Sequence, residues 1–497
     1  MNSSGILRGT ALLTCTGIFS QALGFFYRIA LSRLIGAETM GLFQLIMPVF
    51  SVLMAATAVG LTAAVSTLSA HKLALGDRAG AKALVHRCIG WFLLLGGGAG
   101  ILLAAGSDPI SVYLLGDART QLGLIFLVPC LLLTGVENLQ KHFFYGTGNL
   151  RPPALLELCE QIIRTAAVLG LLVAFLPQNP ERTLGLIVCG MIICEIFSAL
   201  TLTALFRRHM ADVRSAPVKG LLRQVAGVAL PVGGTALLGN LLGSADAILV
   251  PQLLVAGGMP VSEAMRQYGV LFGMTVPLLC LPTAFVGAMG LVLMPNLAEQ
   301  TALGQKRQAA QTIGNCLRST SLLLCPALAW LTAVGPELGN LLFREETSGR
   351  YLLPLAVGVF LSAHQSVLSC ALNGVGRQRT AAANALLGGV VQLLFTVATV
   401  KTWGMGGYVA GALVSAAVSV WLNHRAVGRA IPLETAFFQR LLAPGLAAIL
   451  MGLCVHLLFH TLLSRGVPLP ASLVLSALFG AVLYLAGLVA QGQLARK

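Results

Sequence analysis

The chain has 497 residues, of which 57% are hydrophobic and 10% charged, and its mean hydropathy is +0.86. Soluble proteins carry roughly 25% charged residues, so this composition excludes a soluble multidomain enzyme. Long apolar runs that do not alternate with polar residues indicate a polytopic membrane protein made of α-helices rather than a β-barrel. The net charge of +15 is explained by basic cytoplasmic loops, so we expect no nucleic acid partner.

Apolar runs of about 20 residues mark the predicted membrane spans. We count fourteen, and a count of twelve or thirteen stays open. In chain order the predicted spans lie near residues 11–34, 41–69, 85–106, 121–141, 154–176, 183–206, 225–255, 268–295, 315–334, 351–373, 381–400, 405–423, 441–463 and 471–490. The predicted fold class is therefore an all-α polytopic membrane protein with about 14 transmembrane helices.

Basic residues are unevenly divided between the two sides of these spans. Most of the 32 Lys and Arg residues fall in every second connecting loop, one of which contains Lys141 and Arg151. Such loops face the cytoplasm, which predicts that both termini of this multi-pass membrane protein are cytoplasmic. No connecting loop is long enough to fold alone, and the sequence contains no P-loop, HExxH or GxSxG motif. We therefore expect a transporter and not an enzyme.

An internal repeat relates the two halves of the chain. With an offset of 228 residues, Gly76 falls on Gly304 and Gly148 falls on Gly376. Six spans separate the repeats, so the halves have the same orientation in the membrane. We predict two six-helix lobes, residues 1–212 and 213–430, facing each other across a central cleft, with two extra helices in residues 431–497. Such an architecture suits transport by alternating access.

Ionisable side chains inside a bilayer cost about 2.5–3.5 kcal/mol on insertion scales, so each one needs an explanation. The candidates inside predicted spans are Arg28, Glu137, Glu157, Glu160, Arg164, Glu195 and Asp246. Most of them lie in the first half of the chain. This asymmetry places the expected functional site there.

Two helical stripes carry the candidate binding residues. In the fifth span, the spacing of Glu157, Glu160, Gln161 and Arg164 places all four on one face, where Glu160 and Arg164 can pair at i,i+4. In the first span, one face holds Gln21 and Arg28, together with Gly24, which permits close approach of another helix. We predict that the two stripes line the cleft and make it polar and partly cationic. The alternative is that these residues only hold helices together, with Arg28 neutralising Glu137 or Glu157.

Two acidic residues are candidates for ion coupling. Glu137 lies in the fourth span, and Asp246 is isolated in the seventh span, five residues before Pro251. Asp246 fits a cation or proton site and fits a buried structural carboxylate equally well. No His or Cys spacing indicates a metal site, so we expect neither a metal nor another cofactor.

Three segments resemble a known family. They are GIFSQALGFFYRIALSRLIGAETMGLFQLIMP, YGTGNLRPPALLELCEQIIRTA and YGVLFGMTVPLLCLPTAFVGAMGLVLMPNLAE. They resemble the stage V sporulation protein B branch of polysaccharide flippases. That branch belongs to the multidrug/oligosaccharidyl-lipid/polysaccharide exporter superfamily and is related to lipid II flippases. The resemblance implies two six-helix lobes plus two helices, which move a polyprenyl-pyrophosphate-linked sugar to the outer leaflet.

The resemblance also implies which residues bind substrate. Basic residues of the first lobe engage the pyrophosphate in such flippases, and Arg28 corresponds to one such position. Gln21 stands where these flippases commonly carry an Arg, which implies a weaker or differently built cationic site. The expected substrate-binding residues are Gln21, Arg28, Glu157, Glu160, Gln161 and Arg164.

The sequence favours a flippase for lipid II or another cell-wall or polysaccharide precursor, in peptidoglycan, spore or capsule synthesis. A drug or organic-cation antiporter of the same superfamily is the alternative, because Glu157, Glu160 and Asp246 suit a cationic substrate. A glycosyltransferase using Asp108 and Asp117 is disfavoured by the short outer loops. We expect a monomer whose partners are the lipid-linked substrate and membrane lipids. Its energy would come from Na⁺, H⁺ or the membrane potential.

Overall fold

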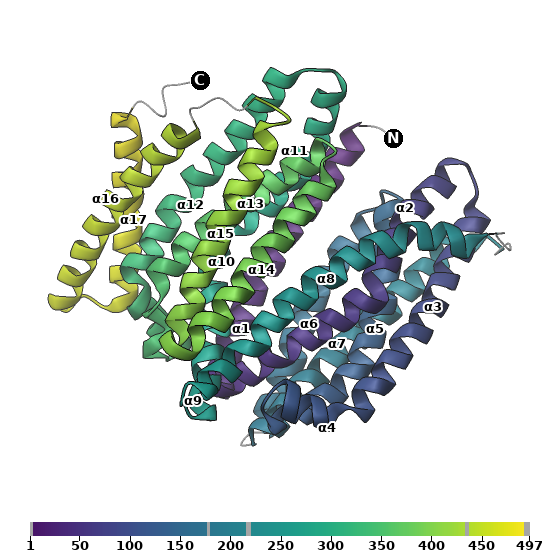
Figure 1. Ribbon diagram of the computed structural model, residues 1–497, viewed down its shortest axis with the longest axis horizontal. Helices are drawn as coiled ribbons and strands as arrows, with labels where there is room; N and C mark the ends of the chain where they lie inside the picture. Colours follow the sequence, from purple (N-terminus) through teal and green to yellow (C-terminus); the bar gives the residue numbers. More distant parts are fainter. Residues whose placement is uncertain (1–2, 176–178, 215–219, 433–436, 492–497) are drawn as a thin grey trace. The chain divides into compact units, whose positions relative to one another are not determined.

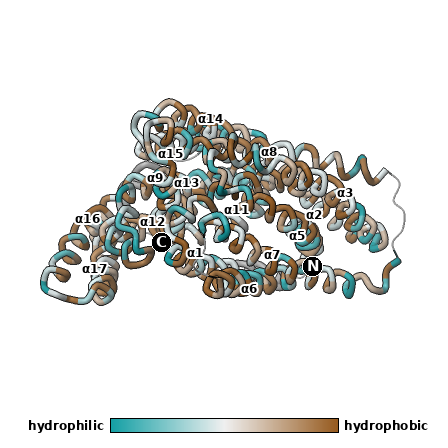
Figure 2. The backbone as a smooth tube through the Cα atoms, turned by 90° about the horizontal axis from the view of Figure 1, so that it is seen from below, coloured by the Kyte–Doolittle hydropathy of each residue, from teal (hydrophilic) through white to brown (hydrophobic). Residues whose placement is uncertain are grey.

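The computed structural model describes residues 3–175, 179–214, 220–432 and 437–491 (Figure 1). Every regular element in these ranges is a helix, which confirms the predicted all-α class. Among the described residues, thirteen helical segments are long and apolar enough to cross a membrane. Figure 2 shows hydrophobic stretches along these helices, α6 and α17 among them. The predicted end of the fifth span, residue 176, lies outside the described ranges.

The first of these segments, Thr16–Ala74, covers most of the first predicted span and all of the second. The chain turns between them at Gly36, whose φ of 74° lies outside the helical region. Only a residue without a Cβ atom adopts this conformation readily. Each of the other segments overlaps one predicted span, so the segments account for all fourteen.

Residues Met1–Gly269 form one compact unit, here called the first unit. Within it, α5 packs against α2, α3 and α7, and α6 packs against α1 and α7. A buried aromatic cluster of Phe92, Phe143, Phe144 and Phe206 joins α3, α5 and α7. The helices of this unit are α1 (Ser3–Met54), α2 (Gly60–Ala74), α3 (Arg78–Ala105), α4 (Ser107–Pro109), α5 (Gln121–Gly146), α6 (Arg151–Phe175), α7 (Pro180–His209), α8 (Leu221–Ala256) and α9 (Val261–Tyr268).

Residues Val270–Lys497 form the second unit. Its last two helices pack against α12, where Trp330 Nε1 donates to Ser476 Oγ at 3.2 Å and the Tyr484 hydroxyl donates to the Leu322 carbonyl at 3.2 Å. The helices are α10 (Val276–Cys280), α11 (Ala284–Ala302), α12 (Lys306–Phe343), α13 (Leu352–Gly374), α14 (Gln378–Trp403), α15 (Met405–Gly428), α16 (Phe437–Ser464) and α17 (Leu469–Ala490).

Along the sequence, the boundary between the two compact units lies directly after α9. The predicted lobes, residues 1–212 and 213–430 with a C-terminal pair in 431–497, divide the chain at a different place and stay a prediction. Of the last range, residues 433–436 and 492–497 lie outside the described part of the chain.

The internal repeat is visible in the helix ends. Gly76 and Gly304 have φ values of 75° and 71°, and Gly148 and Gly376 have values of 73° and 79°. Each of these glycines follows a helix, and its N–H donates to the carbonyl three residues earlier at 3.0–3.1 Å. A left-handed glycine is the usual way to end a helix and satisfy its last carbonyls. Both units therefore use the same turns at an offset of 228 residues.

Close helix contact at Gly41 gives a test of the packing in the first unit. A Cβ atom at Gly41 would lie 2.1 Å from the carbonyl oxygen of Met265 in α9, and backbone cannot rotate out of the way. We therefore expect Gly41→Ala to destabilise the protein by about 1–3 kcal/mol through overpacking. Thermal unfolding of the purified protein in detergent measures this. Gly97→Ala is the control, since a Cβ atom at Gly97 meets open space; equal melting temperatures for both variants would contradict this packing.

Candidate functional site

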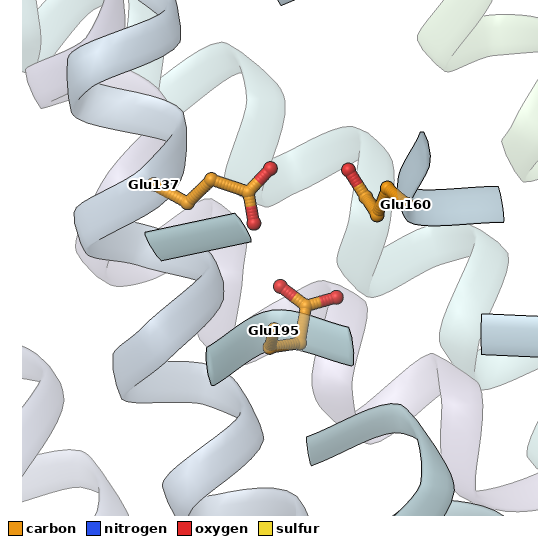
Figure 3. A group of neighbouring side chains, drawn as sticks. All are labelled: Glu137, Glu160 and Glu195. Atoms are coloured by element: carbon orange, nitrogen blue, oxygen red, sulfur yellow. The ribbon is translucent and has the colours of Figure 1, made fainter. Parts of the chain in front are cut away.

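Five ionisable side chains from three helices meet inside the first unit. Glu137 and Lys141 come from α5, Glu160 and Arg164 from α6, and Glu195 from α7. One carboxylate oxygen from each glutamate lies within 4.8 Å of the others, and Figure 3 shows these three side chains converging. We call these five residues the charge cluster.

The two cations of the charge cluster bridge the three helices. Lys141 Nζ contacts Glu137 Oε1 and lies 2.9 Å from Glu160 Oε2, which joins α5 to α6. Arg164 Nη2 contacts Glu160 Oε1 and lies 3.2 Å from Glu195 Oε1, which joins α6 to α7. The predicted i,i+4 pair of Glu160 and Arg164 is therefore confirmed.

The charge cluster is buried, and its carboxylate oxygens differ in whether they accept a hydrogen bond. The side chains of Glu137 and Glu195 are 2% and 4% exposed, whereas that of Arg164 is 25% exposed. Glu195 Oε2 accepts a hydrogen bond from Thr134 Oγ1 at 2.8 Å. Glu137 Oε2 has no hydrogen-bond donor in the described part of the chain. Three carboxylates face two cations, so the cluster carries one excess negative charge when every group is ionised.

The second unit holds neutral residues at the same positions of its repeat. The helices α13, α14 and α15 correspond to α5, α6 and α7 at the offset of 228 residues. At this offset, the cluster positions fall on Gln365, Ser369, Gly388, Gln392 and Asn423. Asn423 Nδ2 donates to Ser369 Oγ at 3.0 Å. Because the second bundle packs with neutral hydrogen bonds, the fold itself does not require the five charges, and we infer that they serve function.

The predicted substrate-binding stripes of α1 and α6 lie against each other. A Cβ atom at Gly24 would lie 3.4 Å from Gln161 Nε2, so Gly24 does permit close approach of a second helix, as predicted. Arg28 is half-buried on α1, and Gln21, two turns earlier, is exposed. The helix pair therefore brings the two stripes into one region of the first unit.

Two other candidates lie outside the charge cluster. Glu157, although it shares α6 with Glu160, joins none of the cluster's ion pairs. Asp246 is buried on α8 and lies in the neighbourhood of Tyr268 on α9. The two predicted ion-coupling residues, Glu137 and Asp246, thus belong to different sites.

Sequence reasoning missed Lys141 and gave no role to Glu195. Lys141 was assigned to a basic loop because the apolar run ends there, but α5 continues to Gly146 and carries Lys141 inside the bundle. The i,i+4 spacing from Glu137 to Lys141 is the signal that could have revealed it. For Glu195, no sequence signal pairs it with Arg164 on the preceding helix.

Comparison with known proteins agrees with the resemblance seen in the sequence. Residues 6–300 match the family described as polysaccharide biosynthesis protein. Stage V sporulation protein B of Bacillus subtilis (strain 168) is 26% identical over 451 residues, which cover 87% of this chain and 86% of that protein. Lipid II flippase MurJ of the same organism is 22% identical over 427 residues, which cover 80% and 78%.

Solved structures share the fold. Lipid II flippase MurJ in an inward closed conformation matches with a TM-score of 0.71 at 13% identity, covering 98% of this chain and 100% of that one. An inward-facing multidrug resistance MATE family transporter of the MOP superfamily matches with a TM-score of 0.64 at 14% identity, covering 84% and 98%. The described fold is therefore shared with this lipid II flippase and with this transporter of the MOP superfamily.

Proposed function

Because the chain belongs to the polysaccharide biosynthesis protein family, we propose that it is a flippase for lipid-linked sugars. It moves a polyprenyl-pyrophosphate-linked sugar, lipid II or another cell-wall or polysaccharide precursor, from the cytoplasmic to the outer leaflet by alternating access. The observation that carries this proposal is the similarity over most of the chain to stage V sporulation protein B and to lipid II flippase MurJ. The match of 98% of this chain to the flippase fold supports it.

The binding site of this proposal lies on the stripes of α1 and α6. The diphosphate head is anionic and strongly hydrated, so hydrocarbon opposes its passage. Arg28 and Arg164 supply positive charge, and guanidinium groups bind phosphate oxygens in a two-pronged geometry. The remaining polar contacts come from Gln21, Gln161, Glu157 and Glu160. The partial exposure of Arg164 leaves part of its guanidinium accessible.

We place the protein in the bacterial cytoplasmic membrane with both termini in the cytoplasm, on the strength of its uneven loop charges. It acts as a monomer. It moves its substrate across the membrane and catalyses no chemical step. The membrane potential or a coupled Na⁺ or H⁺ supplies the energy.

An organic-cation antiporter is the second candidate. Two observations favour it: the excess negative charge of the charge cluster, and the fold shared with a MATE family transporter. That transporter covers 84% of this chain, against 98% for the lipid II flippase, and Arg28 and Arg164 oppose a cationic substrate. The flippase is therefore the better-supported function.

Reconstitution in vesicles separates the two candidates. We expect the purified chain to expose lipid II, or a lipid-linked teichoic or capsular precursor, on the opposite leaflet faster than protein-free vesicles do. Enzymatic labelling of the sugar from outside the vesicle measures the transfer. In parallel, uptake of a fluorescent organic cation under a proton gradient is measured, and we expect none above background. Cation uptake without any movement of the lipid-linked sugars would overturn the proposed function.

A further inference from the structure

One carboxylate of the charge cluster has an oxygen that accepts no hydrogen bond from the described residues. Glu137 is 2% exposed, its Oε1 contacts Lys141, and its Oε2 accepts no hydrogen bond from the described residues. Figure 3 shows this carboxylate pointing toward Glu160 and Glu195. A buried acceptor without a donor costs about 1–3 kcal/mol, and more when it is charged. The site therefore lacks one donor and one positive charge.

We propose that the charge cluster binds one exchangeable proton, carried by Glu137 and shared with the neighbouring carboxylates. The proton adds to Oε2 of Glu137, where it forms an O–H bond, and the charge of the cluster changes from −1 to 0. No other bond forms or breaks, and the proton comes from and returns to water. Closely spaced carboxylates in a buried site favour such sharing, because they cannot all remain ionised at low cost.

The cations already present favour a proton over a metal ion. Lys141 and Arg164 contact the same carboxylates that a metal ion would use. A metal ion among them would sit beside two fixed positive charges, whose repulsion is strong in a weakly polar interior. A proton requires no ligand shell and adds to Oε2 of Glu137, which accepts no hydrogen bond from the described residues.

In the described part of the chain, several ionisable groups interact with Glu137. They are Lys141 and Tyr145 on its own helix, Glu160 on α6, and Glu195 and Cys194 on α7. Arg164 contacts Glu160 and Glu195. Around Glu195 and Arg164 lie Cys130 of α5 and Tyr27 of α1. Thiol and phenol groups carry no charge near pH 7. The five cluster residues therefore decide the net charge.

The consequence for transport rests on the proposed function. Arg164 is the most exposed member of the charge cluster and is also a proposed pyrophosphate ligand. If the pyrophosphate draws the guanidinium away from Glu160 and Glu195, the cluster loses a positive charge and holds its proton more tightly. Linkage requires the reverse as well, so protonation should favour substrate binding. This reciprocity would couple a proton to each lipid-linked sugar.

Infrared difference spectroscopy tests the proton site without any substrate. The full chain is reconstituted in lipid, and spectra at low and high pH are compared for the carbonyl stretch of a protonated carboxyl group. We expect a band that shifts in D₂O, persists in Na⁺ and is lost in Glu137→Gln. Glu181→Gln, which removes an exposed carboxylate of the same unit, should leave the band unchanged.

A second variant tests the charge balance in the opposite direction, with an increase of the band instead of a loss. Lys141→Gln removes a positive charge, so the cluster should bind more protons and the band should increase. A band that survives Glu137→Gln, or that fails to increase in Lys141→Gln, overturns the proposal, and so does a band abolished by Na⁺, which would assign the site to a metal ion. Because no lipid-linked sugar is present, a failure to flip would reject the proposed function and leave this result standing.

Discussion

Arg28→Ala is expected to lower the initial rate of flipping by roughly 10- to 100-fold while the protein still inserts and folds. The estimate follows from losing hydrogen bonds to a charged group, which contribute about 1.5–3 kcal/mol. Arg28 lies inside a predicted span, and the resemblance assigns it to the pyrophosphate. The measurement is the rate at which a lipid-linked sugar becomes accessible to a label outside vesicles.

Two further variants make the Arg28 result specific. Arg465→Ala removes an exposed arginine from the turn between α16 and α17, and it should flip at the wild-type rate. Arg28→Lys keeps the charge but loses the planar fork that grips two phosphate oxygens, so its rate should lie between those of wild type and Arg28→Ala. Wild-type flipping by Arg28→Ala would remove this residue from the binding site.

Arg164→Ala should also lower the rate of flipping, but for two combined reasons. The variant loses a proposed pyrophosphate ligand, and it leaves Glu160 and Glu195 without one of their cations. The flipping rate alone therefore cannot separate binding from stability for Arg164. A measurement of thermal unfolding beside the flipping assay distinguishes the two effects.

The spans were predictable from the sequence because a bilayer imposes a length and an apolar composition on each helix. Each predicted span overlaps a helical segment of the structure for most of its length. The helix ends were less predictable from the sequence. An apolar run ends at the first charged residue, whereas a helix continues for as long as its backbone hydrogen bonds do. Lys141 is an example. The apolar run predicts that it is a loop residue, but in the structure it is one of the two cations of the charge cluster.

Contacts within one helix were also predictable, and contacts between helices were not. The Glu160–Arg164 pair follows directly from i,i+4 spacing. The meeting of Glu137, Glu160 and Glu195 depends on how α5, α6 and α7 rotate about their axes, which side-chain packing decides. The internal repeat supplied part of the missing information, because it shows which positions of the second bundle correspond to the charge cluster.

This correspondence leads to a prediction about the whole charge cluster. Neutral residues of the second unit can be placed at the equivalent positions of the first, with Gln instead of Gly at position 160 to preserve the helix. The variant combines Glu137→Gln, Lys141→Ser, Glu160→Gln, Arg164→Gln and Glu195→Asn. We expect it to insert and unfold near the wild-type temperature, because removing all five charges together leaves none of them buried without a partner. We expect its flipping to fall to background and its carboxyl band to disappear.

Single changes should behave in the opposite way. Lys141→Ser alone leaves Glu137 and Glu160 buried without their shared cation, and breaking a buried pair in this manner costs about 3–5 kcal/mol. Its melting temperature should therefore fall well below that of the fivefold variant, although it changes fewer residues. Thermal unfolding in detergent measures both. If the fivefold variant is the less stable of the two, the charges hold the bundle together, and the inference that they are present for function fails.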